Sequence, residues 1–161
     1  KMDQNVQDFL DEHELKYKLH QHPAVFTCAE ADIHCKGIPG TACKNLFLKS
    51  RKGNNFFLVI LPANKKARLD ELSKILEAKK LKFANENELK DSLGLLPGSV
   101  SILGLLNDSE KKVNLVIDKE LWDAKIVGFH PNINTATLEF AQEEFHKLVK
   151  ILRDGFKILA L

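Results

Sequence analysis

A lysine and an asparagine stand inside a segment that is otherwise typical of a buried strand. Lys44 and Asn45 directly precede the apolar residues Leu46, Phe47 and Leu48. Because side chains alternate along a strand, Lys44 shares a face with Leu46 and Leu48. A cation beside apolar walls holds a phosphate or carbonyl oxygen much more strongly than it would in water. The pattern therefore indicates an oxygen-binding lysine, and the alternative is a lysine that extends from an edge strand into solvent.

A histidine opens a polar loop in the last quarter of the chain. His130 and Pro131 end an apolar segment, and Asn132, Asn134 and Thr135 follow before the next β-rich stretch. A loop of this kind, fixed by a rigid sheet, can present an imidazole and amides to a ligand. The alternative is a turn in which the Asn and Thr side chains satisfy their own backbone and His130 is merely exposed.

A third candidate is the turn at Pro97-Gly98, with Gly104 shortly after it. Glycines allow a backbone to approach a ligand closely, and free N–H groups there can polarise a carbonyl. Pro-Gly turns are common, so this segment alone is a weak indication of a site.

The histidines and cysteines near the N-terminus do not predict a metal site. Their spacings fit no standard set of zinc ligands: His20, His22, Cys28, His34 and Cys35. Cys43 lies beside Lys44, but no His–Asp arrangement accompanies it, and buried reduced cysteines are commoner than nucleophilic ones. No glycine-rich phosphate loop is present. We therefore expect neither a metal nor a cofactor.

The elements that must position these residues alternate between helices and strands. We expect helices after Asp3, from a capping box at 27–30 to about residue 35, over 69–76, from a second capping box at 85–88 to Gly94, and within 139–152. We expect strands over 16–21, 44–48, 55–61, 100–105, 113–117, 125–129 and 135–139. The sequence thus predicts one α+β domain over residues 1–161, with helices on a mixed, mostly antiparallel sheet.

Composition restricts the class of protein further. The 161 residues are 44% hydrophobic and 29% charged, which describes a globular protein rather than a disordered one. No apolar run reaches the length of a membrane span, and no secretory leader pattern opens the chain. Three cysteines without a C-x-x-C pair argue against a disulfide framework. We therefore expect a cytoplasmic protein that does not bind membranes.

Lysines and arginines gather in three clusters, at 49–52, 65–68 and 79–82, although the net charge is only +2. Charge runs on loops are usually solvated faces, and contact with phosphates is the functional alternative.

Five segments, in order, resemble the prolyl-tRNA editing family, which is related to the insertion domain of bacterial prolyl-tRNA synthetase. The similarity covers about residues 6 to 150 and includes His22-Pro23-Ala24-Val25-Phe26-Thr27 with Glu30-Ala31, Gly40 with 44–48, 93–100, 106–108 and 129–137. The resemblance implies the YbaK-like fold of that insertion domain. It also implies a deacylase that acts in trans on mischarged proline tRNA.

The Lys-Asn and His-Pro-Asn-x-Asn-Thr-Ala-Thr segments look like the alanine-specific branch of the family. The cysteine-specific branch usually has Lys-Thr where this chain has Lys44-Asn45. Carried over by position, the resemblance assigns catalysis to Lys44, Asn45, Gly98 and His130. The partners it implies are the acceptor end of mischarged tRNA(Pro) and prolyl-tRNA synthetase. A same-fold deacylase for Cys-, Ser- or Thr-tRNA and a non-catalytic tRNA- or synthetase-binding module remain the alternatives.

Selection of alanine over proline calls for a small apolar pocket. Ile33, Leu46, Phe47 and Phe129 are candidate walls, and core packing explains each of them equally well. Asn132 and Thr135 are further candidates for substrate contact. Lys49, Arg51 and Lys52, near the expected hairpin turn, are candidates for contact with acceptor-stem phosphates.

Overall fold

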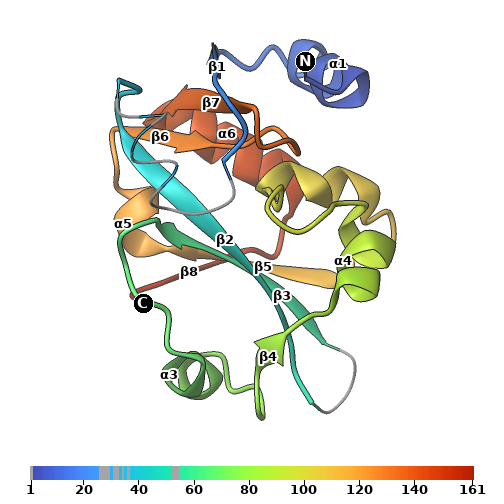
Figure 1. Cartoon of the computed structure of the whole chain (residues 1–161). Helices are drawn as coiled ribbons and strands as arrows, with labels where there is room; N and C mark the ends of the chain where they lie inside the picture. The colour runs from blue at the N-terminus through green and yellow to red at the C-terminus, as the bar shows by residue number, and fades with distance from the viewer. Residues whose placement is uncertain (1, 26–29, 31–32, 34, 36, 52–54) are drawn as a thin grey trace.

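A computed structural model describes residues 2–25, 30, 33, 35, 37–51 and 55–161 (Figure 1). Its helical elements are α1 (Gln4–Glu12), α3 (Leu69–Ile75), α4 (Glu86–Leu93), the 3₁₀ helix η1 (Ile102–Asn107), α5 (Lys119–Trp122) and α6 (Gln142–Leu152). Its strands are β1 (Lys18–Gln21), β2 (Thr41–Lys49), β3 (Phe56–Pro62), β4 (Lys82–Phe83), β5 (Val113–Asp118), β6 (Ile126–Phe129), β7 (Ala136–Ala141) and β8 (Lys157–Leu159).

The strands form one mixed sheet in the order β1-β7-β6-β2-β3-β5-β8, with β4 also pairing with β2. The β1–β7, β6–β7, β2–β3 and β2–β4 pairs are antiparallel. The β2–β6, β3–β5 and β5–β8 pairs are parallel. Figure 1 shows β2 as a long strand that runs from β6 at one end to β4 at the other. The predicted α+β class with a mixed sheet is confirmed, and β2 joins its two halves.

Two hydrophobic clusters flank this sheet. The first cluster packs α1, α4, η1 and α6 on one face and includes the fully buried Leu10, Leu93, Phe140 and Phe145. The second cluster packs α3 on the other face through Leu72 and includes Leu48, Val59, Leu61 and Val116. Alternation along β2 explains the division, because Phe47 faces the first cluster and its neighbour Leu48 faces the second.

Local signals place several helix ends correctly. The Asp3 carboxylate accepts a hydrogen bond from the Asn5 N–H, 2.8 Å away, at the start of α1. The capping box at Asn85 is present in full, since Glu88 also accepts from the Asn85 N–H. Gly94 ends α4 in the left-handed conformation, with φ of 66°. The capping box predicted at 27–30 lies outside the described residues in part, so it stays a prediction.

The strand expected over 100–105 is wrong. Residues Ile102–Asn107 form η1, whose first turn is capped by the Ser101 hydroxyl accepting from the Leu103 N–H. The apolar run there is buried on all sides, and such a run has no period that distinguishes strand from helix. The last helix begins at Gln142 rather than 139, because Ala136–Ala141 belongs to β7.

The Leu-Asn-Asp segment at 106–108 supports the fold. The Asn107 side chain donates to the Leu93 carbonyl at 2.8 Å and so holds the end of α4. The buried Asp108 carboxylate accepts from Arg153 Nη2 at 2.7 Å and from the Val113 N–H at 2.8 Å. In the described part of the chain, no helix is both long and apolar enough to cross a bilayer.

Candidate functional site

Strands β2 and β6 separate just where the candidate residues stand. The two strands are parallel and pair only at Thr41 with Val127 and at Ala42 with Gly128. Strand β6 ends at Phe129, whereas β2 continues to Lys49. Beyond Ala42, this edge of β2 therefore no longer pairs with β6. We call this place the β2–β6 fork.

The register at the fork brings two predicted site residues together. Lys44 lies two positions after Ala42, and His130 lies two positions after its partner Gly128. Paired residues of parallel strands point to the same face, and Ala42 and Gly128 are such a pair. Alternation therefore assigns Lys44 and His130, which directly follows β6, to the same face of the sheet.

Gly40 allows β2 to begin this close to β6. Its φ is 98°, a conformation that L side chains rarely adopt. A Cβ at this position would lie 2.8 Å from the Ile126 carbonyl oxygen and 2.5 Å from the Ile126 side chain. Glycine is thus required at the point that sets the β2–β6 register.

Lys44 and Asn45 lie on opposite faces of β2. Lys44 pairs with Leu61 on the face of the second cluster, as predicted from its spacing to Leu46 and Leu48. Asn45 pairs with Ile60, which belongs to the first cluster. Among the described residues, no carboxylate lies within ion-pair distance of the half-buried Lys44. A ligand that touches both side chains must therefore lie against the open edge of β2.

Two buried amide oxygens near the fork lack hydrogen-bond donors in the described structure. They are Oδ1 of Asn45 and Oδ1 of Asn132. Asn132 also has a positive φ of 64°. Unsatisfied buried acceptors are uncommon and call for a donor from a ligand or a water molecule. Both residues were predicted from the sequence as contacts to substrate.

His130 is held by a backbone carbonyl. Its Nδ1 lies 3.0 Å from the Ala136 oxygen. A carbonyl only accepts, so Nδ1 carries the proton, and in the neutral ring Nε2 has a free lone pair. Burial lowers the pKa of His130, and the nearby His22 lowers it further, against the opposing effect of the Ala136 carbonyl. The half-buried ring is therefore a neutral hydrogen-bond acceptor near pH 7.

Gly98 occupies the predicted turn with a φ of 86°. The turn is closed by a hydrogen bond from the Ser99 N–H to the Leu96 carbonyl at 3.1 Å. Gly98 is exposed, and the Leu96 side chain beside it is 63% exposed. The backbone freedom expected of Gly98 is present, and its contact with substrate stays a prediction.

The four candidate pocket walls separate into two groups. Phe47 and Phe129 are only 5% and 3% exposed and lie in the first cluster, where Phe47 stacks on Phe56 and Phe129 packs on Phe140. Alternation directs both rings into the core, which is the alternative that the sequence left open, and their assignment to a pocket wall stays a prediction. Leu46 is half-buried beside the second cluster on the face of Lys44, and Ile33 is 73% exposed.

The segment around His22 is tied to the His130 loop. The His22 N–H donates to the Thr135 carbonyl at 3.0 Å, and the Val25 N–H donates to the Asn134 carbonyl at 3.1 Å. The Asn134 amide also donates to the Val25 carbonyl. Two segments that the sequence offered as separate motifs thus form one structure. The Thr135 side chain is exposed, and Thr135 contacts His22 through its backbone carbonyl.

Sequence reasoning missed two polar residues beside His130, namely His22 and Thr137. The His22 ring bonds the Thr137 hydroxyl at 2.8 Å and lies 6.2 Å, between ring centroids, from His130. The available signal was the polar pair Thr137 and Glu139 at alternate positions of an otherwise apolar strand. Such alternation indicates that this face of β7 meets polar groups.

The cysteine and metal alternatives receive no structural support. Burial raises the pKa of the Cys43 thiol to about 12, so it remains protonated and a poor nucleophile. Within the described part of the chain, no three His, Cys, Asp or Glu side chains are placed to hold a metal ion. Cys28 and His34 lie outside the described residues.

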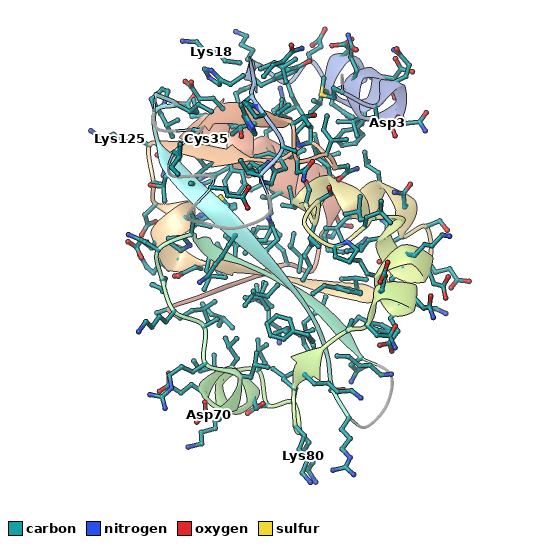
Figure 2. The ribbon with its side chains drawn as sticks, viewed as in Figure 1. Asp3, Lys18, Cys35, Asp70, Lys80 and Lys125 are labelled. Carbon is teal, nitrogen blue, oxygen red and sulfur yellow. The ribbon has the colours of Figure 1, made fainter. Side chains whose placement is uncertain are left out.

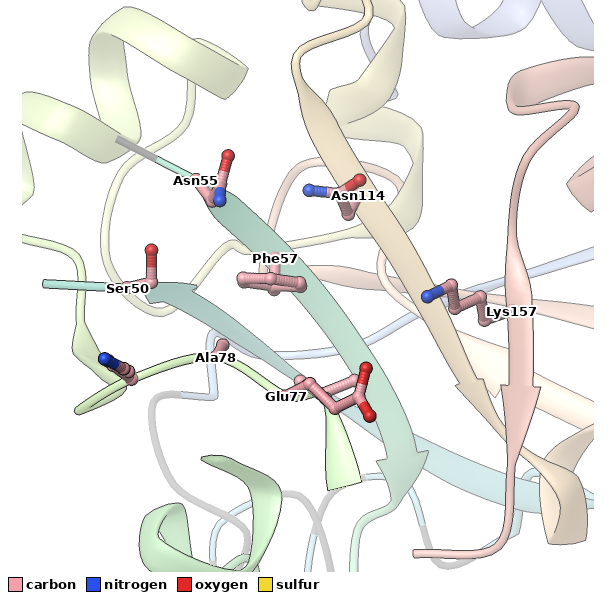
Figure 3. Close-up of a pocket in the computed structure, with 9 residues that line it drawn as sticks. Ser50, Asn55, Phe57, Glu77, Ala78, Asn114 and Lys157 are labelled. Atoms are coloured by element: carbon pink, nitrogen blue, oxygen red, sulfur yellow. The ribbon is translucent and has the colours of Figure 1, made fainter. Parts of the chain in front are cut away.

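The predicted phosphate-binding residues differ in their surroundings. Lys49 forms an ion pair with Glu88. Arg51 is exposed, and Lys52 lies outside the described residues. Next to Arg51, a cavity of about 510 Å³ is lined by the residues drawn in Figure 3, among them Asn55, Phe57, Asn114 and Lys157. This cavity lies at the hairpin end of β2, away from the fork.

Comparisons with known proteins agree with this geometry. Residues 22–148 match the family model of the aminoacyl-tRNA editing domain. The chain is 37% identical over 153 residues to the prolyl-tRNA editing protein ProX of Acetoanaerobium sticklandii, covering 94% of this chain and 93% of that protein. It is 35% identical to prolyl-tRNA synthetase associated domain-containing protein 1 of Danio rerio, covering 83% and 73% of the two chains.

A solved structure shows the same fold. The crystal structure of a candidate trans-editing enzyme for prolyl-tRNA synthetase superposes with a TM-score of 0.73 at 18% identity, covering 100% of this chain and 98% of the other. The family match spans most of the chain, including His22, the β2–β6 fork and the His130 loop. This chain therefore belongs to the aminoacyl-tRNA editing domain family.

Proposed function

We propose that this protein hydrolyses mischarged proline tRNA in trans and that its preferred substrate is Ala-tRNA(Pro). The observation that carries the proposal is the convergence of Lys44 and His130 at the β2–β6 fork, in a family whose description is aminoacyl-tRNA editing. The name of the bacterial relative, a prolyl-tRNA editing protein, supports proline tRNA as the carrier.

The reaction is hydrolysis of an ester between an amino acid and the terminal ribose. The oxygen of water bonds to the carbonyl carbon, the bond from that carbon to the ribose oxygen breaks, and the ribose oxygen takes up a proton. Such esters are labile, so positioning and charge stabilisation matter more than a strong nucleophile. This chemistry requires neither a metal nor a cofactor.

Lys44 is the proposed anchor for the terminal ribose-phosphate or the carbonyl side of the ester. The half-buried position beside Leu46 strengthens its attraction for an oxygen. Asn45 and backbone N–H groups near Gly98 are proposed to orient the ester and to stabilise the oxyanion. The unpaired Oδ1 of Asn45 supports its role, since a buried acceptor there gains a donor when substrate binds.

His130 is proposed to hold the ammonium group of the amino acid. Its Nδ1–H is committed to the Ala136 carbonyl, which leaves the Nε2 lone pair to accept from an N–H of the substrate. The unpaired Oδ1 of Asn132 is a second acceptor for the same cation. A general-base role for His130 ranks below this positioning role.

Selectivity is proposed to depend on size. The site must admit alanine and exclude proline, which makes it a second sieve behind the synthetase. Leu46 remains a candidate wall because it shares the face of Lys44, and Ile33 remains one because its side chain is free of the core. The alternative with the same fold is a deacylase that removes cysteine, serine or threonine from tRNA.

A non-catalytic module that recruits tRNA or a synthetase is the alternative of a different class. The name of the zebrafish relative, a synthetase associated domain protein, favours prolyl-tRNA synthetase as a second partner. A binding module would retain tRNA without turnover and would lose no hydrolysis on substitution of Lys44.

The test is deacylation of Ala-, Cys-, Ser-, Thr- and Pro-charged tRNA by the wild-type protein, Lys44→Ala and Lys150→Ala. We expect rapid loss of alanine only, a decrease of kcat/KM on the order of 10²- to 10³-fold in Lys44→Ala, and no change in Lys150→Ala. Lys150 is an exposed residue of α6, on the opposite face of the sheet. Survival of all five esters with wild-type protein would support the binding module instead.

A further inference from the structure

A second imidazole stands beside His130 and has no role in the proposed reaction. The His22 Nε2 lies 2.8 Å from the Thr137 Oγ, and its Nδ1 lies 2.9 Å from the Pro23 carbonyl oxygen. The His22 and His130 ring centroids are 6.2 Å apart with an interplanar angle of 59°. Both ring nitrogens of His22 are thus engaged, whereas His130 keeps Nε2 for a ligand.

The partners of His22 determine where its proton lies. The Pro23 carbonyl can only accept, so Nδ1 of His22 carries the hydrogen. In the neutral ring Nε2 then accepts, and the Thr137 hydroxyl must be the donor. The remaining lone pairs of Thr137 Oγ face the Cys35 thiol at 4.0 Å, a distance at which a weak S–H donor can contribute. Cys35 therefore donates a weak hydrogen bond to Thr137, and Thr137 donates a hydrogen bond to His22.

Adjacent residues of β7 hold the two imidazoles. The Ala136 carbonyl fixes Nδ1 of His130, and the Thr137 side chain fixes Nε2 of His22. The β1–β7 register, with His20 opposite Thr137, places this hydroxyl on the same face as the pair formed by His20 and Glu139. The start of β7 is therefore a common support that sets one ring relative to the other.

We propose that His22 and Thr137 form a positioning pair that holds His130 as a neutral acceptor for the aminoacyl ammonium. This inference rests on the proposed function. Burial and the neighbouring His22 lower the pKa of His130, and His130 Nδ1 is committed to the Ala136 carbonyl, so Nε2 of His130 remains available as an acceptor. The Pro23 carbonyl fixes the tautomer of His22, and the Thr137 hydroxyl fixes the orientation of its ring. His22 itself does not touch the substrate.

Other charged or titratable groups share this face. His20 and Glu139 bond each other at 2.9 Å on β1 and β7, Cys35 lies beside Thr137, and Lys44 faces His130 from β2 by register. Figure 2 labels Cys35, which lies toward the end of the molecule opposite Lys80. The Glu139 carboxylate is committed to His20, which leaves His22 as the titratable ring nearest to His130 among the described contacts.

Thr137→Val and Thr137→Ser separate the hydroxyl from the shape of the side chain. We expect Thr137→Val to lower kcat on Ala-tRNA(Pro) by about tenfold with KM changed less than about twofold, because ring orientation is lost while tRNA contacts remain. Thr137→Ser keeps the donor and should retain most of the activity. Equal losses in both variants, or no loss in Thr137→Val, would overturn the proposal.

Nitrogen-15 NMR of the histidine rings tests the same pair without substrate. The wild-type protein should show the Nδ1–H tautomer for His22 and His130, and Thr137→Val should shift the Nε2 resonance of His22, which loses its hydrogen-bond donor, while the Nε2 resonance of His130 stays unchanged. His22→Phe keeps a ring and removes its charge, so the measured pKa of His130 should rise. An unchanged pKa of His130 in His22→Phe contradicts the coupling. If the wild-type protein deacylates nothing, the proposed function fails while these spectra still decide on the pair.

Discussion

His130 is a side chain whose chemistry is decided by one backbone contact. The Ala136 carbonyl takes the Nδ1 proton, so a neutral ring offers only a lone pair at Nε2. A protonated ring would present a donor there and would repel an ammonium group. In the proposed reaction, the state of this single imidazole would therefore decide whether the fork attracts or rejects an aminoacyl ester.

This argument predicts the pH dependence of the reaction. Burial holds the pKa of His130 below its ordinary value of 6.5. We expect the acid limb of kcat/KM on Ala-tRNA(Pro), where protonation of His130 removes the acceptor for the ammonium group, to lie below pH 6.5. Initial rates in buffers of constant ionic strength measure the profile, and a ring-NMR titration of His130 provides the matching pKa. An acid limb centred above 6.5 would contradict the prediction.

The same shift links His130 to stability. Its pKa is lower in the folded chain than in the unfolded chain, so the unfolded chain binds the proton first as the pH falls. The contribution of His130 to stability is therefore complete above about pH 6.5 and is lost as the pH falls through the folded-state pKa.

At the scale of residues, the sequence predicted what local alternation determines. The face of Lys44 follows from its spacing to Leu46 and Leu48, and the structure agrees. The pairing of His22 with Thr137 joins residues 115 positions apart, and no local pattern encodes such a contact. Phe47 and Phe129 lie in the core, and the sequence could not decide between the two explanations offered for them, because an aromatic residue beside a candidate site has the same sequence signature in a core as in a pocket wall.

At the scale of elements, the site depends on how β2 begins. Strand β2 belongs to both halves of the sheet, and its first residues alone pair with β6. A shift of this short contact by one residue would direct Lys44 away from the face of His130. Gly40 fixes the contact through a backbone conformation and a close approach that a larger residue cannot reproduce.

Gly40→Ala should therefore destabilise the protein and lower its activity together. We expect a loss of about 1–3 kcal/mol in the free energy of unfolding, since the added Cβ meets Ile126 and the φ of 98° is unfavourable for alanine. Urea unfolding followed by circular dichroism measures the change. Gly155→Ala is the matched control, because its Cβ would enter open space. Equal stability of the two variants would show that Gly40 does not set the register.

Helices whose ends are marked by capping residues could be predicted from the sequence. Short strands that exist only through pairing with distant strands could not. The capping box at Asn85 and the stop at Gly94 are encoded within a few residues. Strand β4 has two residues and β8 has three, and both exist only through their pairing with β2 and β5. Helix η1 was mistaken for a strand because burial on all sides removes the periodicity that separates the two.

At the scale of the whole molecule, the fork and the basic hairpin end are two regions of one long strand. Residue 45 of β2 and residue 50, which directly follows this strand, are separated by about 17 Å at the usual rise of about 3.3 Å per residue. One strand of a nucleic acid duplex rises about 3.4 Å per nucleotide, so this span corresponds to about five nucleotides. An acceptor end bound at the fork can therefore extend toward Arg51 and Lys79, which are joined by a backbone hydrogen bond.

The combined Arg51→Glu and Lys79→Glu variant should weaken tRNA binding without changing the chemistry. We expect KM to rise on the order of tenfold at low salt, kcat to stay unchanged, and the salt dependence of log Kd to lose about one to two units of slope. Fluorescence anisotropy with labelled tRNA measures the binding. The combined Lys147→Glu and Lys150→Glu variant changes the net charge by the same amount at two exposed residues of α6, on the opposite face, and is the control for net charge. An equal effect of both variants would mean that the net charge of the protein, rather than a defined surface, determines tRNA binding.

The long-range pairing of β2 has a consequence for synthesis of the chain. The hairpin of β2 and β3 consists of neighbouring segments and can form early, whereas β6 and β7 are made about 80 residues after the start of β2. Contacts between distant segments form late, because the loop between them must close first. A nascent chain that has not yet released Ala136 and Thr137 from the ribosome has neither imidazole in place. The two imidazoles therefore take up their positions only after the segment around Ala136 and Thr137 has been synthesised.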